Sequence, residues 1–488
     1  MAILAPEQRQ WFGQPRGLFT LFFTEMWERA TYYGMRAILL LFMTAMIADG
    51  GLGMDDRTAN SIYGLYISAT YLSSLWGGWV ADRLIGQQRA IAAGGFLIML
   101  GNALLIVSDT RFFFVGLTII IFGTGLLKPN ISAIVAQLYP EGGARRDAGF
   151  SVFYMGINLG ALFGQFLVPI TAAAYGWKTG FAVPALGMLV GLLQFWRGRK
   201  FLGHAGAQAP GPVARWWPVY GLVAIVAVII VMGATGHLHF DPVSISRGAN
   251  WAMMLLAAGY FAYLLAFAGL DRVARSRTLV MIALFAACAM FWAGFEQAGA
   301  SFTLFAERYT DRDLFGWVIP AGAVQSVNAL FIIAFAPLFA ALWVWLGKRN
   351  LDPSAPAKFA LGLIFMGLGF AVMVAASGYV VAGHKVLPTW LVLTYLLHTF
   401  GELCLSPVGL SSMTKLAPPR FVGQVMGVWF LATAIGSNLA GQFAGEIDPN
   451  NLATLPGQYL YLFWWGTLAG LVMLILTPLI KRLMAGAR

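Results

Sequence analysis

Four charged side chains lie inside one long apolar segment near the start of the chain. The segment spans residues 17–46, which is long enough to cross a bilayer, yet it contains Glu25, Glu28, Arg29 and Arg36. Each charge at membrane depth costs about 2.5–3.5 kcal/mol on insertion scales, so such residues are found where they face a polar interior and have partners. We therefore expect these side chains to face water rather than lipid.

The spacing of the charges predicts a single stripe on a helix. Glu25, Arg29, Tyr32 and Arg36 follow one another at steps of four, three and four residues, with Glu28 beside them. Residues three and four positions apart share one helix face. A charged, tyrosine-lined stripe on a membrane helix is typical of the wall of a water-filled cavity.

Three more ionisable residues fall inside other apolar segments, namely the acids Glu296 and Glu402 and the base Lys128. The interior thus holds four acids and three bases. This near-balance predicts mutual compensation, because a buried lone charge costs far more than a paired one. Cations and anions fixed a short distance apart would suit a ligand that carries a negative charge at one end and a positive charge at the other.

The acids of the first segment also suggest a route for protons. Proton coupling requires a carboxylate whose proton affinity responds to desolvation and to neighbouring charges. Our hypothesis is that Glu25 and Glu28 exchange Arg29 as partner with protons and with a substrate carboxylate. The blander interpretation is an ion-pair cluster that only pins two helices together.

The composition predicts an all-α polytopic membrane protein. Of the 488 residues, 59% are hydrophobic and only 10% are charged, which no soluble globular domain matches. Apolar segments of about 20 residues or more indicate membrane helices. We predict fourteen spans, at residues 17–46, 58–84, 90–108, 112–139, 148–175, 180–197, 216–236, 250–270, 278–306, 316–346, 357–382, 387–414, 420–445 and 457–480.

The excess of basic residues is a topology signal. The net charge is +11, from 31 Lys and Arg against 20 Asp and Glu. Most of these cations fall into one set of alternate loops, which by the positive-inside rule predicts that both termini are cytoplasmic. We therefore expect no nucleic-acid partner.

The two halves of the chain share an ordered set of sequence echoes. Pro129 and Pro140 are 11 residues apart, and so are Pro407 and Pro418. These echoes favour two six-helix bundles, and such repeats place the substrate site at their interface near the bilayer midplane. The predicted parts are an N-terminal bundle at 1–200, a linker with an inserted helix pair at 201–277, and a C-terminal bundle at 278–488.

Several segments together resemble the signatures of the proton-dependent oligopeptide transporters of the major facilitator superfamily. Residues 25–34 read Glu-Met-Trp-Glu-Arg-Ala-Thr-Tyr-Tyr-Gly and are similar to the first-helix signature, except at Ala30, where the family usually has Phe. That position is expected to serve packing. The other segments that resemble the family, in the expected order, are 78–89, 125–130, 153–160, 291–297 and 401–410.

This resemblance is to the bacterial type and covers nearly the whole chain. It implies the major facilitator fold and a proton-coupled symporter that imports di- and tripeptides by alternating access. It also implies a monomer in the bacterial inner membrane, with a proton gradient and no cofactor. A metal site and an enzyme are not expected, because the five histidines have no metal-ligand spacing and no nucleophile–base pair stands out.

The resemblance assigns roles in substrate binding. It implies that Arg29 and Lys128 face the peptide carboxylate, while Glu402, Asn158 and Asn328 hold the amino terminus. Recognition of the two ends would leave the peptide side chains to roomy aromatic pockets. The candidates for this lining are Tyr32, Tyr33, Tyr71, Tyr154, Trp292 and Trp429, and Arg36 is a further candidate for binding.

The resemblance also assigns roles in coupling and gating. Two pairs, Arg36 with Glu296 and Lys128 with Glu402, are expected to form across the halves and to break and re-form during transport. The candidates for proton coupling are Glu25, Glu28, Arg29 and Glu296.

Two other transport functions fit part of the pattern. A proton-coupled drug exporter would use an aromatic, acidic cavity for organic cations, whereas Arg29 and Lys128 suit an anionic end. A small-anion transporter would have no need of Glu402. Without the family resemblance, Asn158 and Asn328 would equally suit hydrogen bonds between helices.

Overall fold

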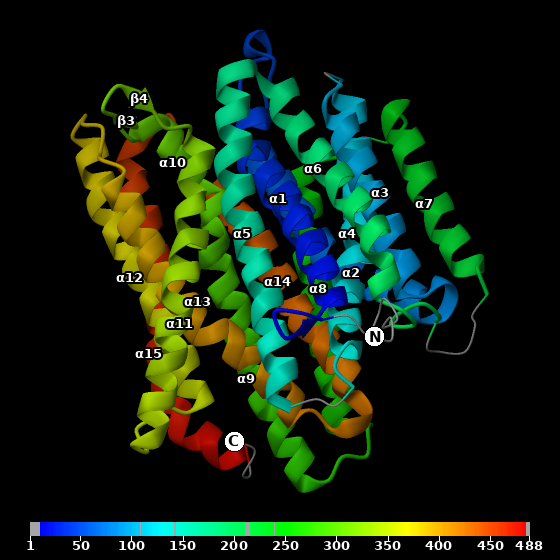
Figure 1. The fold of residues 1–488 in the computed structure, drawn as a ribbon. Helices are drawn as coiled ribbons and strands as arrows, with labels where there is room; N and C mark the ends of the chain where they lie inside the picture. The colour runs from blue at the N-terminus through cyan, green and yellow to red at the C-terminus, as the bar shows by residue number, and fades with distance from the viewer. Residues whose placement is uncertain (1–9, 108, 141–142, 210–214, 239, 485–488) are drawn as a thin grey trace. The chain divides into compact units, whose positions relative to one another are not determined.

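The computed structural model describes residues 10–107, 109–140, 143–209, 215–238 and 240–484. Long α-helices make up nearly all of this part of the chain (Figure 1). Their bounds are α1 (Arg16–Thr44), α2 (Asp56–Val80), α3 (Gln87–Leu105), α4 (Thr110–Gln137), α5 (Gly143–Tyr175), α6 (Trp177–Gly198), α7 (Trp217–Ala234), α8 (Pro242–Ala266), α9 (Arg272–Phe295), α10 (Ser301–Tyr309), α11 (Ser326–Lys348), α12 (Ala355–Val381), α13 (Thr389–Leu416), α14 (Val422–Gly445) and α15 (Leu455–Leu483).

Short elements connect or extend these helices. Two antiparallel hairpins pair β1 (Gln10–Trp11) with β2 (Gln14–Pro15), and β3 (Asp313–Leu314) with β4 (Trp317–Val318). A π-helical turn at Ala81–Ile85 follows α2. The single-turn 3-10 helices lie at Ile47–Asp49, Arg199–Phe201, Glu296–Gly299, Ala321–Gln325, Pro419–Phe421 and Leu452–Thr454.

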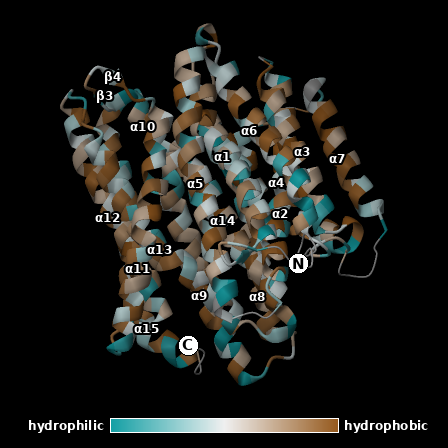
Figure 2. Cartoon of the chain, viewed as in Figure 1, coloured by the Kyte–Doolittle hydropathy of each residue, from teal (hydrophilic) through white to brown (hydrophobic). Residues whose placement is uncertain are grey.

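The helices confirm the predicted set of fourteen spans. Within the described residues, eleven helical segments are long and apolar enough to cross a membrane, and α9, its 3-10 turn and α10 form one of them, Arg272–Tyr309. The other three predicted spans are α1, whose charges lower its hydropathy, the less apolar α2, and the shorter apolar α7. Figure 2 shows hydrophobic residues along most helices and hydrophilic residues at many helix ends.

The chain packs into two compact units. Unit 1 comprises residues 1–53 and 69–241, and unit 2 comprises residues 54–68 and 242–488. The helix α2 therefore contributes its first part to unit 2 and its second part to unit 1. The predicted division at 1–200, 201–277 and 278–488 remains a prediction, and residues 210–214 of its linker lie outside the described residues.

In unit 1, α1 packs against α5 and α6, and α3 packs against α4 and α6. The side chains of Leu18, Leu127 and Phe195 belong to one buried cluster that joins these helices. In unit 2, α12 packs against α13 and α15, while α14 packs against α8 and α9. Each unit thus has its own helix-packed core.

Small residues bring α1 and α5 into backbone contact. A Cβ atom added at Gly164 would lie 2.1 Å from the carbonyl oxygen of Ala30, and one at Gly160 would lie 2.2 Å from the carbonyl oxygen of Met26. Small residues at membrane helix interfaces allow this close approach. Ala30 therefore lies at a helix–helix contact, in agreement with the packing role expected for it.

The second part of α2 approaches α4 equally closely. A Cβ atom added at Gly77 would lie 2.0 Å from the carbonyl oxygen of Gly125, and the hydroxyl of Ser73 donates to the carbonyl oxygen of Ile121 at 2.9 Å. The amide of Asn130 on α4 donates to its own helix at Leu126, at 2.7 Å. This contact places the neighbouring polar residues of the two helices side by side.

We expect Gly77→Ala to lower the stability of the protein by about 1–3 kcal/mol, the usual range for overpacking of a tight core. The added methyl group meets backbone, which cannot move aside as a side chain could. Gly78→Ala is the matched control, because no described atom lies within 4 Å of a Cβ there. Thermal unfolding in detergent should show a lower midpoint for Gly77→Ala alone, and equal midpoints for both variants would contradict the close approach.

Candidate functional site

The charged residues of α1 form a buried cluster in unit 1. The Nε of Arg29 lies 3.2 Å from Oε1 of Glu25 and also donates to Oε2 of Glu28. All three side chains are buried, with relative exposures of 3%, 3% and 0% for Glu25, Arg29 and Glu28. One guanidinium is therefore shared by two carboxylates, and Glu28, which the spacing placed beside the stripe, takes part directly.

This cluster has hydrogen-bonding capacity left over. Among the described residues, Oε2 of Glu25, Oε1 of Glu28 and Nη2 of Arg29 are buried and have no hydrogen-bond partner. Buried polar atoms in native structures nearly always have a partner, so such groups need an explanation. Two free acceptors and one free donor in one cluster suit a site that receives protons and a polar ligand.

The aromatic residues of α1 surround its cations. The Cζ of Arg29 lies 5.1 Å from the ring centre of Tyr32 and 5.9 Å from that of Tyr33. The Cζ of Arg36 lies 5.8 Å from the ring centre of Tyr33. Aromatic faces attract cations at these distances, and the two rings themselves meet edge to face at 5.2 Å. The predicted stripe of charges and tyrosines is thus one contiguous surface of α1.

Three other helices of unit 1 carry further candidates. Lys128 on α4 places its Nζ 4.2 Å from the ring centre of Tyr71 on α2 and interacts electrostatically with the Glu25 carboxylate. On α5, Asn158 is buried, and its amide donates to the carbonyl oxygen of Tyr154 at 3.0 Å. The Asn158 side chain therefore forms a hydrogen bond within its own helix. The side chain of Tyr154 is half-exposed.

Unit 2 contains a second polar cluster built from three elements. Glu296 begins the 3-10 turn after α9, Asn328 lies in α11 and Glu402 lies in α13. The amide of Asn328 donates a hydrogen bond to the hydroxyl of Thr399 at 2.9 Å. The side chain of Glu402 interacts with the side chain of Asn328 and electrostatically with Glu296. Tertiary packing thus brings together three candidates that are far apart in the sequence.

Glu402, like Glu25 and Glu28, has a buried carboxylate oxygen that accepts no hydrogen bond from the described residues. Its Oε2 atom is buried and has no hydrogen-bond partner among the described residues. The indole Nε1 of Trp292 is in the same situation, and the ring packs edge to face on Phe295 at 5.2 Å. A buried acceptor and a buried donor in one unit suit a bound molecule with an ammonium group and other polar atoms.

The candidate Trp429 and the residue His398 are both packed in the interior of unit 2. The ring of Trp429 lies against Gly409, where a Cβ would approach it to 2.1 Å, and near the ring of Phe359. His398 is buried among the rings of Phe302 and Phe370, and its Nε2 lies 3.1 Å from the carbonyl oxygen of Met366. His398 therefore belongs to an aromatic core.

Unit 2 also contains an ion pair that was not predicted from the sequence. Arg308 at the end of α10 binds Asp56 at the start of α2 through two parallel contacts, Nη1–Oδ2 at 2.5 Å and Nη2–Oδ1 at 2.7 Å. The same part of α2 donates from Ser68 to the carbonyl oxygen of Ala434 at 2.6 Å. The sequence offered one indication of this pair, because Asp56 and Arg308 carry opposite charges at the ends of two predicted spans on the same predicted side of the membrane.

The capping group of α2 lies next to this pair, outside the spans. The backbone N–H of Thr58 donates to Oδ1 of Asp55 at 3.0 Å. That hydrogen bond holds the pKa of Asp55 below its usual value, because it stabilises the carboxylate form. The start of α2 is therefore fixed both by a helix cap and by a forked ion pair.

The two predicted gate pairs each have one member in unit 1 and one in unit 2. They join Arg36 with Glu296 and Lys128 with Glu402, and both pairs remain predictions. The binding roles predicted for the individual residues likewise remain predictions, and the structure brings only some of these residues together in the two polar clusters described above.

The chain was compared with protein families and with known proteins. The model of the POT family matches residues 88–454. A peptide transporter of Yersinia enterocolitica is 42% identical over 499 residues, which cover 98% of this chain and 97% of that protein. A di-/tripeptide transporter of Lactococcus lactis is 35% identical over 506 residues and covers both chains completely, at 100% each.

Solved structures match just as extensively. A crystal structure of peptide transporter POT in complex with sulfate has a TM-score of 0.91 and 41% identity, covering 98% of each chain. A POT family transporter in complex with a thioalcohol-conjugated peptide has a TM-score of 0.89 and 35% identity, covering 97% of this chain and 98% of that one. These matches confirm the predicted fold class, and the apolar helices and bacterial relatives identify an integral membrane protein of the bacterial inner membrane. Because the family model and full-length relatives agree over most of its length, the chain belongs to the POT family of transporters, as its sequence signatures predicted.

Proposed function

We propose that this protein is a proton-coupled symporter that imports di- and tripeptides across the bacterial inner membrane. The observation that carries the proposal is the buried cluster of α1, in which Glu25 and Glu28 share Arg29 and polar atoms remain unsatisfied. The relatives named as peptide and di-/tripeptide transporters support the same substrate class. The protein would act as a monomer with both termini in the cytoplasm.

The peptide would be held by its two charged ends. In unit 1, the free Nη2 donor of Arg29 and the ammonium of Lys128 are suited to the peptide carboxylate. In unit 2, the free oxygen of Glu402 and the side chain of Asn328 are suited to the peptide ammonium. Charge-assisted hydrogen bonds are shorter and about twice as strong as neutral ones, so they favour recognition of both ends.

Side chains of the peptide would contact the remaining candidates. This lining would have little sequence preference, because aromatic rings and amides adapt to many groups. The residues proposed for it are Tyr32, Tyr33, Tyr71, Tyr154, Asn158, Trp292 and Trp429.

Protons would be coupled through the shared guanidinium. Arg29 is shared by Glu25 and Glu28, and Lys128 also interacts with Glu25, so the charges compensate one another when neither acid is protonated. When a peptide carboxylate binds Arg29, the glutamates lose part of their counter-ion, and binding of a proton restores the balance. The substrate and the proton therefore favour each other's binding, as coupling between two sites requires.

Alternating access would follow from the gate pairs. We propose that Arg36 with Glu296, and Lys128 with Glu402, form in one state and separate in the other. Binding of the peptide carboxylate to a base, or of a proton or the peptide ammonium to a glutamate, would weaken the attraction within the pair. The same groups would thus bind, couple and gate.

The substrate assignment predicts a clear pattern of inhibition in liposomes that contain the pure protein. With the outside more acidic, a labelled dipeptide should accumulate, and unlabelled dipeptides with free termini should compete for uptake. The same dipeptides with an acetylated amino end or an amidated carboxyl end should compete at least about tenfold less well, because each loses a charged hydrogen bond of about 1.5–3 kcal/mol. Competition by organic cations or nitrate instead would favour drug export or anion transport.

A further inference from the structure

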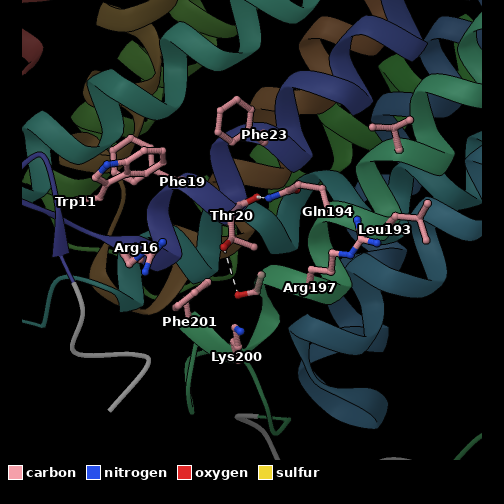
Figure 3. A pocket seen from close by; sticks show the side chains of 12 residues that line it. Trp11, Arg16, Phe19, Thr20, Phe23, Leu193, Gln194, Arg197, Lys200 and Phe201 are labelled. Carbon is pink, nitrogen blue, oxygen red and sulfur yellow. Dashed lines mark hydrogen bonds between the residues drawn. The ribbon is translucent and has the colours of Figure 1, made fainter. Parts of the chain in front are cut away.

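A cavity of about 620 Å³ lies in unit 1, where α1 begins and α6 ends (Figure 3). The helix α1 lines it with Arg16, Phe19, Thr20 and Phe23, which are spaced so as to share one face. One wall of the cavity is therefore a single face of α1. This cavity is separate from the Glu25–Glu28–Arg29 cluster, none of whose residues lines it.

The helix α6 contributes the opposite wall with the same spacing. Its lining residues are Val190, Leu193, Gln194 and Arg197, followed by Lys200. On both helices the charged residue lies at the helix end, and the apolar residues lie deeper in the span. Along both helices, the residues that line the cavity therefore change from basic at the helix end to apolar deeper in the span.

The charged end of the cavity is purely cationic. Three of its described lining residues, Arg16, Arg197 and Lys200, are basic, and none is acidic. Among the described residues, no carboxylate forms an ion pair with any of the three. Phe201 lies between two of these cations, with its ring centre 4.6 Å from Cζ of Arg16 and 5.3 Å from Nζ of Lys200.

The deeper end of the cavity is lined by apolar side chains that are partly exposed on the surface of unit 1. The relative exposures of Phe23, Val190 and Leu193 are 36%, 44% and 42%. Apolar side chains that are exposed on membrane spans suit contact with acyl chains. In Figure 3, Phe23 lies on one side of Thr20, and Phe201 and Lys200 lie on the other side.

The polar residues between the two ends fix the walls to each other. The hydroxyl of Thr20 donates to the carbonyl oxygen of Gly198 at 3.3 Å, and the amide of Gln194 donates to the carbonyl oxygen of Thr20 at 3.3 Å (Figure 3). The hydroxyl of Thr24 in turn donates to Oε1 of Gln194 at 3.0 Å. The cavity therefore has a braced shape, which favours a specific ligand over loose adsorption.

We propose that this cavity binds one anionic phospholipid of the cytoplasmic leaflet. Its phosphate would lie among Arg16, Arg197 and Lys200, and one acyl chain would lie along Phe23, Val190 and Leu193. Basic pockets between membrane helices on the cytoplasmic side are suited to anionic headgroups. A soluble anion would use only the charged end, whereas a phospholipid matches the charge and the apolar wall together.

The test is lipid retention by the full-length protein, measured by native mass spectrometry after incubation with phosphatidylglycerol or phosphatidylcholine. One phosphatidylglycerol per chain should be retained in preference to phosphatidylcholine. The variant Arg16→Gln/Arg197→Gln should weaken that preference, by about fivefold for each cation removed. The control Lys481→Gln/Arg482→Gln removes two cations from the end of α15 and should leave the preference unchanged.

A second variant separates the lipid from a soluble anion. Leu193→Trp keeps all three cations but fills the apolar end, so it should displace phosphatidylglycerol and leave any binding of inorganic phosphate intact. Thermal unfolding of each variant without added lipid shows whether it is still folded. Equal retention of both lipids, or loss of phosphatidylglycerol in the control as well, would overturn the proposal. Tight binding of phosphate together with no effect of Leu193→Trp would identify a soluble-anion site instead.

Discussion

Replacing Glu28 by glutamine should abolish accumulation of peptide against its gradient, while exchange of peptide across the membrane continues. Glu28 is fully buried, and its Oε2 accepts a hydrogen bond from Arg29. Glutamine keeps the size and the acceptor oxygen but neither carries the charge nor takes up a proton. The binding step would therefore survive, and the coupled step would not. Glu25→Gln is expected to behave in the same way, because Glu25 shares the same guanidinium.

Two assays in liposomes distinguish these steps. Uptake driven by an acidic outside should fall to background in both variants, whereas exchange of labelled for unlabelled peptide without a pH gradient should stay within a few fold of the unchanged protein. Glu307→Gln is a suitable control, since Glu307 is exposed and pairs with Arg312 at 3.0 Å outside the cluster. A variant of Glu25 or Glu28 that still concentrates peptide would show that protons are coupled elsewhere.

Arg29→Lys is expected to impair both uphill uptake and exchange. The Nε of Arg29 contacts Glu25 and Glu28, which leaves Nη2 as a donor for the substrate. Lysine retains the positive charge but offers a single compact ammonium in place of the planar fork, so it cannot serve all three partners at once. Loss of one charged hydrogen bond costs about 1.5–3 kcal/mol, so the KM for peptide exchange should rise about ten- to a hundredfold.

The retained charge makes this variant informative. It leaves no carboxylate of the cluster without a counter-ion, and the fold should therefore survive, as thermal unfolding in detergent can verify. Arg57→Lys, an equivalent change at an exposed position in the first turn of α2, should alter neither assay. If Arg29→Lys exchanged peptide with an unchanged KM, the peptide carboxylate would have to bind another group.

The different outcomes expected at Glu28 and Arg29 separate two interpretations of the cluster. A structural ion-pair cluster predicts loss of stability in every variant and no difference between the two assays. A coupling site predicts selective loss of uphill uptake at the acids and general loss of transport at the arginine. The comparison therefore tests the proposed function rather than the integrity of α1.

The sequence by itself determined the membrane class, the fourteen spans and the charged stripe of α1. Each of these depends on local information: an apolar run of sufficient length, and a helical period that places Glu25, Arg29 and Arg36 on one face. The bounds of α1 and α4 differ from the prediction by no more than two residues. The family signature added the expected roles of residues far apart in the chain.

Only the tertiary structure decided which of these residues lie together. The spacing placed Glu28 beside the stripe, but its side-chain conformation brings it into contact with Arg29. The grouping of Asn328 with Glu402 depends on the packing of α11 against α13. The ion pair of Asp56 with Arg308 joins two residues that are 252 positions apart in the sequence. The cavity between Arg16 and Arg197 likewise needs both α1 and α6. Helix periodicity specifies which face of a helix a residue occupies, whereas the neighbour of that face depends on close packing between helices, which no local pattern contains.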